Sequence, residues 1–417
     1  MSHRKRIAAT TAVAVSFLTA AAALAGCGPV SGASAGSGPT TQVVAAAPSS
    51  SATGDTQQNQ RTSPAIPAEP PLGAGQVGTL AQVPWAVVGA GWALAQYTTG
   101  SFQTAGPVTL YLIDPEGGMY RIYRWPATTE PWTLVSWSGD KSRVLLRQQG
   151  TSQPTFHQLT IATGHISTFT LPADVTSVVG YTRPTGQNIL VEENGIVRYT
   201  LTGAFQTRLS AGTEDDGAVS APNGTSEIVS GGPGVLLVSN SGAAIRFLPV
   251  PGAGGLGCRP VRWWNSATVL ASCISGQVFA PRLWLVPVSG AAPTALTPQR
   301  TDGGPDFGDI DAWQLPSGLY LQALGACGPP FIAKQLATGA IQAVTVPGSN
   351  GNGIVVATAG SHLLVQEFSE CDPGSTVVWF DPATNAVQKV LTKQPGTTGV
   401  ASVIPFTADG EQPPAQG

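Results

Sequence analysis

Short apolar runs alternate with tight turns along residues 80–410, and one pattern recurs there. It consists of an apolar strand, a turn containing glycine or asparagine, and a second strand, which is typical of a β-hairpin. Glycine and asparagine suit such turns because hairpin turns need residues with positive φ. The seven copies begin at residues 110, 156, 196, 235, 283, 331 and 377, and their turn residues are Gly118, Gly164, Gly203, Gly242, Gly290, Gly339 and Asn385.

A second pattern lies between the hairpins, namely an apolar strand that ends near an aromatic residue, a polar turn, and another apolar strand. Examples are LVSWSGDKSRVLLRQ from residue 134, VVGYTRPTGQNILVEE from 178, VRWWNSATVLASC from 261, DAWQLPSGLYLQAL from 311 and GIVVATAGSHLLVQEF from 353. Each repeat therefore supplies four antiparallel strands in about 40–50 residues, which is the size of a β-propeller blade. We predict an all-β fold, a seven-bladed β-propeller of four-stranded antiparallel blades over residues 79–410.

Closing such a ring requires a partner strand for the first blade. The stretch SVIPFTADG, residues 402–410, has the pattern of an inner strand and its turn. We predict that it supplies the innermost strand of the first blade, beside WALAQY at residues 92–97. In the alternative, the inner strand comes from PWAVV at residues 84–88.

The N-terminus has the layout of a secretory signal. The basic stretch from His3 to Arg6 is followed by an apolar run over residues 7–24. The sequence that follows, Leu24-Ala25-Gly26-Cys27, resembles the lipobox of bacterial lipoproteins. In that family the signal is cut before the cysteine and the thiol carries a diacylglycerol. The resemblance implies a lipoprotein signal peptide over residues 1–26, lipidation of Cys27 and an extracytoplasmic, membrane-anchored protein. The alternatives are an uncleaved membrane anchor and a plain signal peptide with a chance cysteine.

Residues 27–78 consist mostly of Gly, Ser, Ala, Thr, Pro and Gln, with few large apolar side chains. Such a segment cannot bury enough surface to offset the entropy of ordering it. We predict a flexible tether there, and a disordered tail over residues 411–417.

The chain has five cysteines, an odd number for an exported protein. If Cys27 carries lipid, an even set remains: Cys258, Cys273, Cys327 and Cys371. All four fall in loops on one face of the predicted ring. We predict disulfides Cys258–Cys273 within a blade and Cys327–Cys371 between neighbouring blades; the alternative is Cys273–Cys327 with Cys258–Cys371. Zinc and redox roles are disfavoured because the spacing is wrong for zinc and no Cys-x-x-Cys is present.

Only 10% of the residues are charged and the net charge is −3, so the basic stripe of a nucleic-acid-binding protein is missing. Many acidic residues fall in the loops of the face that carries the cysteines. Either these loops are simply polar because they are solvated, or the acidic residues form a rim for a cationic ligand, a basic partner or a divalent ion. The acidic residues are Glu130, Asp174, Glu192, Glu193, Glu214, Asp215, Asp216, Asp302, Asp306, Asp309, Glu370 and Asp372. Asp302, Asp306 and Asp309 form a weak candidate Ca²⁺ site. No catalytic or cofactor-binding residue stands out.

Two stretches carry a family resemblance. Trp137-Ser138-Gly139-Asp140 and the hairpin RLWLVPVSGAAPTALT, from residue 282, resemble the repeats of TolB-type and WD-repeat-like propellers, with Gly139 where that family has proline. The resemblance implies partners in the cell envelope. We predict a monomeric, non-catalytic binding or scaffold module for an envelope protein or glycan. The alternative is a propeller enzyme, a hydrolase, lactonase or quinone-dependent oxidoreductase, that uses the acidic loops.

Overall fold

The chain divides into two contact units, residues 1–65 and 66–417, and the structure, a computed structural model, describes parts of the second one only. The described ranges are 71–100, 106–125, 132–148, 151–210, 217–275, 278–300, 306–325, 330–349, 353–368 and 375–406. Among them, no helix has both the length and the hydropathy needed to cross a bilayer. The described residues form β-strands and one short 3₁₀ helix, η1 (Leu80–Gln82), which bears out the all-β prediction.

Five sheets have four antiparallel strands each, ordered along the sheet as they are in the chain. The first two are β5 (Trp132–Trp137), β6 (Arg143–Gln148), β7 (Thr155–Thr160), β8 (His165–Thr170), and β9 (Ser177–Tyr181), β10 (Asn188–Glu192), β11 (Ile196–Thr200), β12 (Phe205–Arg208). The third and fourth are β13 (Ala218–Ser220), β14 (Ser226–Ser230), β15 (Gly234–Ser239), β16 (Ala244–Pro249), and β17 (Ala253–Asn265), β18 (Thr268–Ser275), β19 (Val278–Pro287), β20 (Thr294–Ala295). The fifth is β21 (Asp306–Leu315), β22 (Gly318–Gly325), β23 (Phe331–Gln335), β24 (Ile341–Val344).

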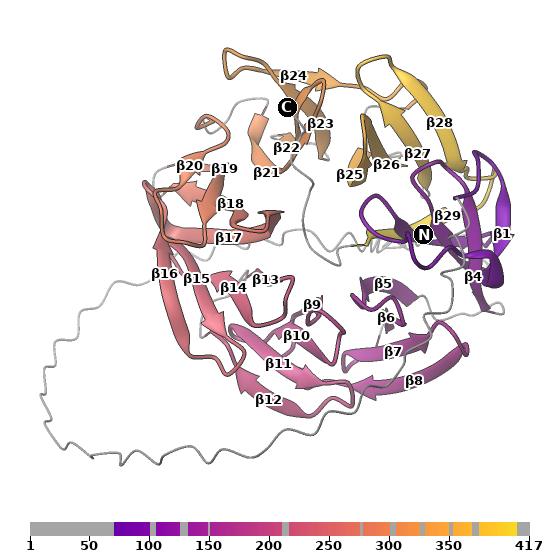
Figure 1. The fold of residues 1–417 in the computed structure, drawn as a ribbon, viewed down its shortest axis with the longest axis horizontal. Helices are drawn as coiled ribbons and strands as arrows, with labels where there is room; N and C mark the ends of the chain where they lie inside the picture. The colour runs from indigo at the N-terminus through magenta and orange to yellow at the C-terminus, as the bar shows by residue number, and fades with distance from the viewer. Residues whose placement is uncertain are drawn as a thin grey trace, which may run out of the picture. The chain divides into compact units, whose positions relative to one another are not determined.

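The sixth sheet has nine strands and combines the two ends of the described chain. Its strands are β1 (Val77–Thr79), β2 (Ala93–Thr98), β3 (Val108–Ile113), β4 (Met119–Trp125), β25 (Gly353–Ala359), β26 (His362–Phe368), β27 (Ser375–Asp381), β28 (Ala386–Leu391) and β29 (Gly399–Pro405). A single residue pair, Ser375 with Val400, joins its β25–β28 part to the rest. The sheets of this unit follow one another around a common centre, which is the architecture of a β-propeller, and in the five four-stranded sheets the first strand in sequence is innermost (Figure 1).

The C-terminal strand β29 closes the sheet at the start of the propeller. It pairs with β2 from Ala93 to Thr98, as predicted, although the strand starts at Gly399 rather than 402. Its neighbours on both sides hold it further, because Ser375 Oγ donates to the carbonyl of Val400 (2.6 Å) and Leu134 N donates to Ser402 Oγ (3.2 Å). The strand therefore links the last hairpin, the first strands and β5.

The hairpin turns use the residues that the sequence pattern indicated, with one exception. Positive φ is found at Gly164, Gly203, Gly242, Gly290, Gly339 and Asn385. In the first hairpin Gly117 (φ 83°) takes this position, not Gly118. The neighbouring Asp114 explains the shift, because its Oδ1 accepts hydrogen bonds from the amides of Glu116 and Gly118 and so fixes the turn one residue earlier.

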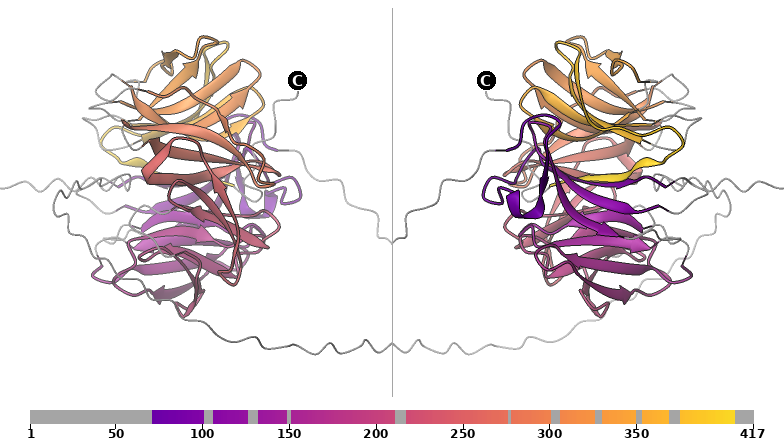
Figure 2. Two further views of the ribbon diagram at one scale, coloured as in Figure 1. Left: turned by 90° about the vertical axis from the view of Figure 1, so that its left-hand side faces the viewer. Right: turned by 90° about the vertical axis from the view of Figure 1, so that its right-hand side faces the viewer.

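One strand near the start of the described chain was not predicted from the sequence. Residues 77 and 78 were assigned to the tether, but β1 pairs in parallel with the outer strand β4 of the first hairpin. The Leu72 amide also donates to the hydroxyl of the buried Tyr120 (3.0 Å). This segment lies nearest the viewer in the right-hand view of Figure 2, on the outside of the propeller. Three residues with one large apolar side chain are too short for a pattern to indicate.

The core lies between neighbouring sheets, where buried aromatic side chains also carry hydrogen bonds from one sheet to the next. The indole Nε1 of Trp379 on β27 donates to the carbonyl of Asp114 (3.1 Å), and that of Trp263 on β17 donates to the carbonyl of Ser220 (2.8 Å). A buried ion pair, Arg198 with Glu227 (3.1 Å), joins β11 to β14. Burial alone raises the pKa of Glu227, and its bonds to Ser220 and Arg198 act against that rise. Each sheet thus depends on its neighbours for both burial and polar contacts.

Removing β29 should therefore open the propeller. Deleting residues 399–417 leaves the edge of β2 unpaired and exposes the faces of Ala93, Leu94 and Ala95, which are fully buried. We expect the truncated chain to lose its cooperative thermal transition in scanning calorimetry and its near-ultraviolet circular dichroism. Deleting residues 407–417 alone keeps β29 and serves as the matched control. An unchanged transition in the longer deletion would show that β29 does not close the fold.

Candidate functional site

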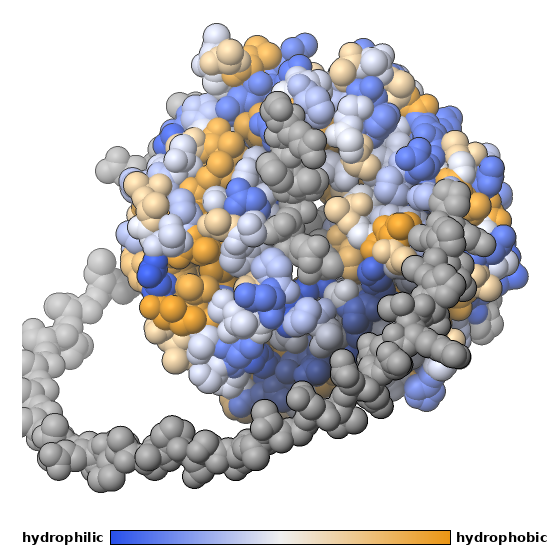
Figure 3. All heavy atoms as spheres, viewed as in Figure 1, coloured by the Kyte–Doolittle hydropathy of each residue, from blue (hydrophilic) through white to orange (hydrophobic). Residues whose placement is uncertain are grey.

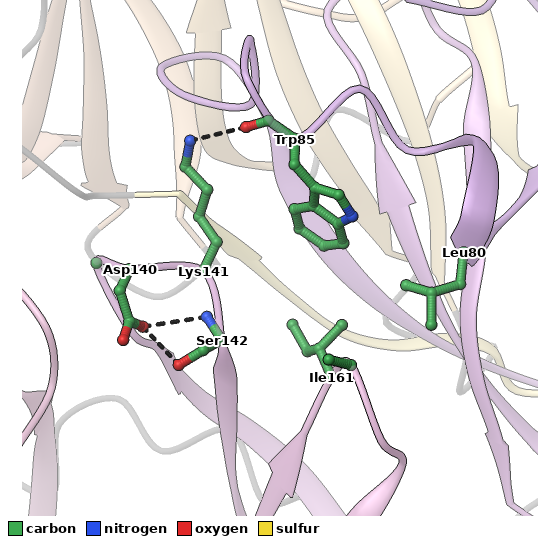
Figure 4. A pocket seen from close by; sticks show the side chains of 8 residues that line it. Leu80, Trp85, Asp140, Lys141, Ser142 and Ile161 are labelled. Atoms are coloured by element: carbon green, nitrogen blue, oxygen red, sulfur yellow. Dashed lines mark hydrogen bonds between the residues drawn. The ribbon is translucent and has the colours of Figure 1, made fainter. Parts of the chain in front are cut away.

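An open depression lies where η1 and the loop after it meet two strand turns. Its lining comes from η1 and the following loop (Leu80, Trp85), the β5–β6 turn (residues 139–142) and the β7–β8 turn (Ile161, Ala162), and its volume is about 670 Å³. Three stretches that are separate in sequence thus form one concave surface. Figure 4 shows the apolar side chains of Leu80, Trp85 and Ile161 facing one another across it.

The β5–β6 turn is the Trp137-Ser138-Gly139-Asp140 stretch that the sequence analysis compared with TolB-type propellers. Its carboxylate is held inside the turn, because Asp140 Oδ1 accepts hydrogen bonds from Ser138 Oγ (2.6 Å), Ser142 Oγ (2.7 Å) and the Ser142 amide (3.1 Å). Partial burial acts to raise the pKa of Asp140, but these bonds and the guanidinium of Arg143 outweigh it and hold the pKa below its ordinary value. The ionised carboxylate of Asp140 is therefore favoured, and it stabilises the turn through these hydrogen bonds.

A close approach to the next sheet explains the glycine in this turn. A side chain at position 139 would place its Cβ 2.1 Å from the carbonyl oxygen of Pro184. Real Cβ atoms do not come so near a backbone atom, so any larger residue would push the β5–β6 and β9–β10 turns apart. Gly139 is thus fixed by the packing of neighbouring turns in this chain.

Lys141 contacts residues near both ends of the described chain, Trp85 and Phe406. Its Nζ donates to the Trp85 carbonyl (3.1 Å) and lies 5.6 Å from the centre of the Phe406 ring, which packs edge-on against Trp137 (4.7 Å). Both charged groups of the depression thus make internal contacts, Asp140 through its Oδ1 and Lys141 through the carbonyl of Trp85. What remains accessible to a ligand is mainly the apolar surface of the half-buried Leu80 and Trp85, with the buried Ile161 at the floor.

Trp85, Lys141 and Ile161 were not predicted from the sequence as site residues. Trp85 belongs to PWAVV, which was considered only as a candidate inner strand, and Lys141 directly follows the recognised turn. The proximity of these segments depends on the tertiary structure. Only the WSGD-like turn itself was a signal that could have drawn attention to this face.

Several predicted site residues lie outside the described part of the chain: Cys27, Cys327, Cys371, Glu130, Glu214, Asp215, Asp216, Asp302, Glu370 and Asp372. The structure contains the Cys258–Cys273 disulfide, which joins directly paired positions of β17 and β18 and is the bridge expected within one blade. This bridge is incompatible with the alternative pairing Cys273–Cys327. Among the residues whose side chains are described, no three His, Cys, Asp or Glu residues are grouped so that they could hold a metal ion.

The acidic residues that are described do not form an open rim. Glu193 is buried, and it accepts hydrogen bonds from Tyr199 Oη and from Arg208 Nη2 (3.1 Å). Asp309, part of the candidate Ca²⁺ site, is fully buried and pairs with Arg300 (3.4 Å), whereas the side chain of Asp306 is outside the described set. Asp174 is exposed and Glu192 half-buried. Glu193 and Asp309 thus serve ion pairs inside the protein, which corrects the expectation of a rim at those two positions.

No family model and no curated protein sequence matches the chain. Among solved structures, TolB from Acinetobacter baumannii aligns with 12% identity and a TM-score of 0.44, over 77% of this chain and 67% of that one. A putative 6-phosphogluconolactonase from Bacteroides fragilis aligns with 14% identity and a TM-score of 0.47, over 75% and 98% of the two chains. A puromycin-hydrolyzing peptidase from Mycobacterium tuberculosis aligns with 15% identity and a TM-score of 0.43, and the aligned part covers 77% of this chain but only 56% of the peptidase. At these values no activity is carried over to this chain.

The Cys258–Cys273 disulfide should contribute measurably to stability. It closes a loop with a sequence separation of 15, for which the entropy of the unfolded chain predicts about 3 kcal/mol. We expect the Cys258→Ser, Cys273→Ser double variant to lower the free energy of unfolding in urea by this amount.

A reducing agent should lower the free energy of unfolding of the wild-type protein toward that of the double variant. The double variant itself has no Cys258–Cys273 bridge to lose, so reduction of this bridge cannot lower its stability further. A loss below about 0.5 kcal/mol would mean that the β17–β18 pairing alone holds these strands.

Proposed function

We propose that this protein is a non-catalytic, seven-bladed β-propeller, anchored through lipid on Cys27 to the outer side of a membrane, that binds a protein of the cell envelope. The blade count takes the nine-stranded sheet as two blades, β29 with β2–β4 and β25–β28, in addition to the five separate sheets. The single residue pair between its two parts supports this division. The order of basic, apolar and small residues before Cys27 supports the anchor.

The depression at Trp85 carries the binding part of the proposal. Tryptophan is among the residues most enriched at the energetic centres of protein interfaces, because it offers a large rigid apolar surface. Here Trp85 is half-buried and faces Leu80 and Ile161. An apolar side chain of a partner that enters this space would be desolvated without leaving Asp140 or Lys141 unpaired, since both keep their internal bonds.

A protein partner fits this depression better than a glycan. A sugar needs donors and acceptors that are free to replace its hydration, because an unpaired hydroxyl costs binding energy. The carboxylate of Asp140 already accepts three hydrogen bonds at one oxygen, and the ammonium of Lys141 is engaged with a carbonyl. We therefore place the envelope glycan second.

The enzyme alternative rests on carboxylates in the loops. A carboxylate that works as a general acid or nucleophile must reach its substrate. Glu193 and Asp309 are instead buried and paired with Arg208 and Arg300. These contacts favour a structural role for both residues.

The anchor can be tested by replacing the modified cysteine. We expect the wild-type protein to sediment with the membrane fraction and to incorporate a labelled fatty acid, and the Cys27→Ser variant to do neither. The Cys258→Ser, Cys273→Ser variant is the matched control for loss of a cysteine elsewhere. Membrane association that persists in Cys27→Ser without label would point to an uncleaved anchor and contradict lipidation.

The binding site can be tested by placing a photo-crosslinking residue at Ala162, which is exposed and lines the depression. In the native cell envelope we expect one discrete crosslinked protein, whose yield below saturation falls about thirtyfold with Trp85→Ala, because truncating a central tryptophan costs about 2 kcal/mol or more. Phe205→Ala, which also truncates an exposed aromatic residue (58% exposed), is the matched control and should not change the yield.

Three results would overturn the proposal: a yield that Trp85→Ala leaves unchanged, a crosslink to glycan alone, and turnover of a sugar or lactone by the purified protein. The first would remove the depression from the binding site. The second would exchange the protein partner for a glycan. The third would favour the enzyme alternative.

A further inference from the structure

The outer strand β16 has more exposed apolar surface than a solvated edge strand normally keeps. It pairs with β15 along one edge, and no strand pairs with its other edge among the described residues. Ile245 and Phe247 are 54% and 44% exposed. Figure 3 shows hydrophobic residues gathered over β15 and β16 at the left of the molecule. Proteins usually protect such edges with charge, proline or a covering segment, because unpaired amides and carbonyls accept further strands.

A groove of about 570 Å³ runs beside this edge. One wall is the strand itself, residues 246–249, and the other is the β19–β20 loop of the next sheet, residues 289–293, which carries only small residues and proline. The guanidinium of Arg246 crosses between the walls and donates to the carbonyl of Ser289. The groove is therefore bounded by β16 on one side and by the β19–β20 loop of the next sheet on the other.

Arg246 is the one charged residue that lines this groove, and it is exposed. No carboxylate of the described residues forms a salt bridge with it. A partner whose other side chains match the apolar walls thus gains from carrying a carboxylate opposite Arg246, since a charged pair at an interface favours one partner over others of the same shape.

The protein already uses this mode of contact once. On β4, another outer strand, the segment Val77–Thr79 adds as an extra strand in parallel register. An outer strand of this propeller can therefore pair with an extended segment. β16 offers a similar edge with a groove beside it.

We infer that β16 is a docking edge for an extended segment of another protein, with apolar residues at alternate positions and a carboxylate that pairs with Arg246. The segment adds to the free edge of β16 by main-chain hydrogen bonds, and its side chains contact Phe247 and the 289–293 loop. This surface uses none of the residues that line the Trp85 depression, so either site can fail its test while the other stands.

The probe is a fluorescent, end-capped peptide of about eight alternating valine and glutamate residues, a usual strand length. We expect saturable binding to the full-length protein in fluorescence anisotropy, and binding about tenfold weaker for a valine–lysine peptide of the same length. Arg246→Glu should reverse this preference. Arg124→Glu, the same charge change on the exposed face of outer strand β4, should leave it unchanged.

Two further measurements distinguish strand addition from binding through side chains alone and from misfolding of the variant. Two N-methylated peptides, one methylated at the valine amides and one at the glutamate amides, keep the side chains but each removes the donors of one strand edge; the peptide methylated at the edge that faces β16 should not bind the wild-type protein. A melting temperature for Arg246→Glu within a few degrees of wild type shows that the variant is folded. The proposal is overturned if no peptide binds, if N-methylation has no effect, or if Arg246→Glu keeps the wild-type preference. A concentration-dependent dimer that Ile245→Lys abolishes would assign the edge to a second copy and also overturn it.

Discussion

The pairing of β29 with β2 is the contact on which the rest of the propeller depends. Every sheet buries its two faces against its neighbours, so a row of sheets that did not return on itself would leave two apolar faces in water. The return is made by main-chain hydrogen bonds between strands from opposite ends of the described chain. Polar contacts, such as Arg198 with Glu227 and Trp379 with Asp114, then hold neighbouring sheets at a fixed distance from one another.

The Trp85 depression is a product of the same closure. Phe406, the residue after β29, lies under Lys141 and against Trp137, and Lys141 in turn holds the carbonyl of Trp85. The position of the candidate site therefore depends on the C-terminal strand as much as on the residues that line it. The shape of this surface and the integrity of the propeller are therefore physically coupled, because its loops are positioned by the scaffold.

Much of the fold could be predicted from the sequence because its signals are local. The alternation of apolar and polar residues, and turn residues such as Gly203 and Asn385, depend on a few neighbouring positions. Parallel strand β1 was missed because three residues carry no periodicity. The depression and the ion pairs of Glu193 and Asp309 were missed for another reason: each joins residues from different strands or turns, and a carboxylate in a loop has the same sequence pattern whether it faces water or an arginine.

The closure also imposes an order of events during biosynthesis. Ser402 on β29 contacts Gln96 on β2 across a separation of 306 residues, so the first sheet lacks its innermost strand until nearly the whole described chain has left the ribosome. Until then, a nascent chain carries unpaired strand edges that are prone to association with other chains.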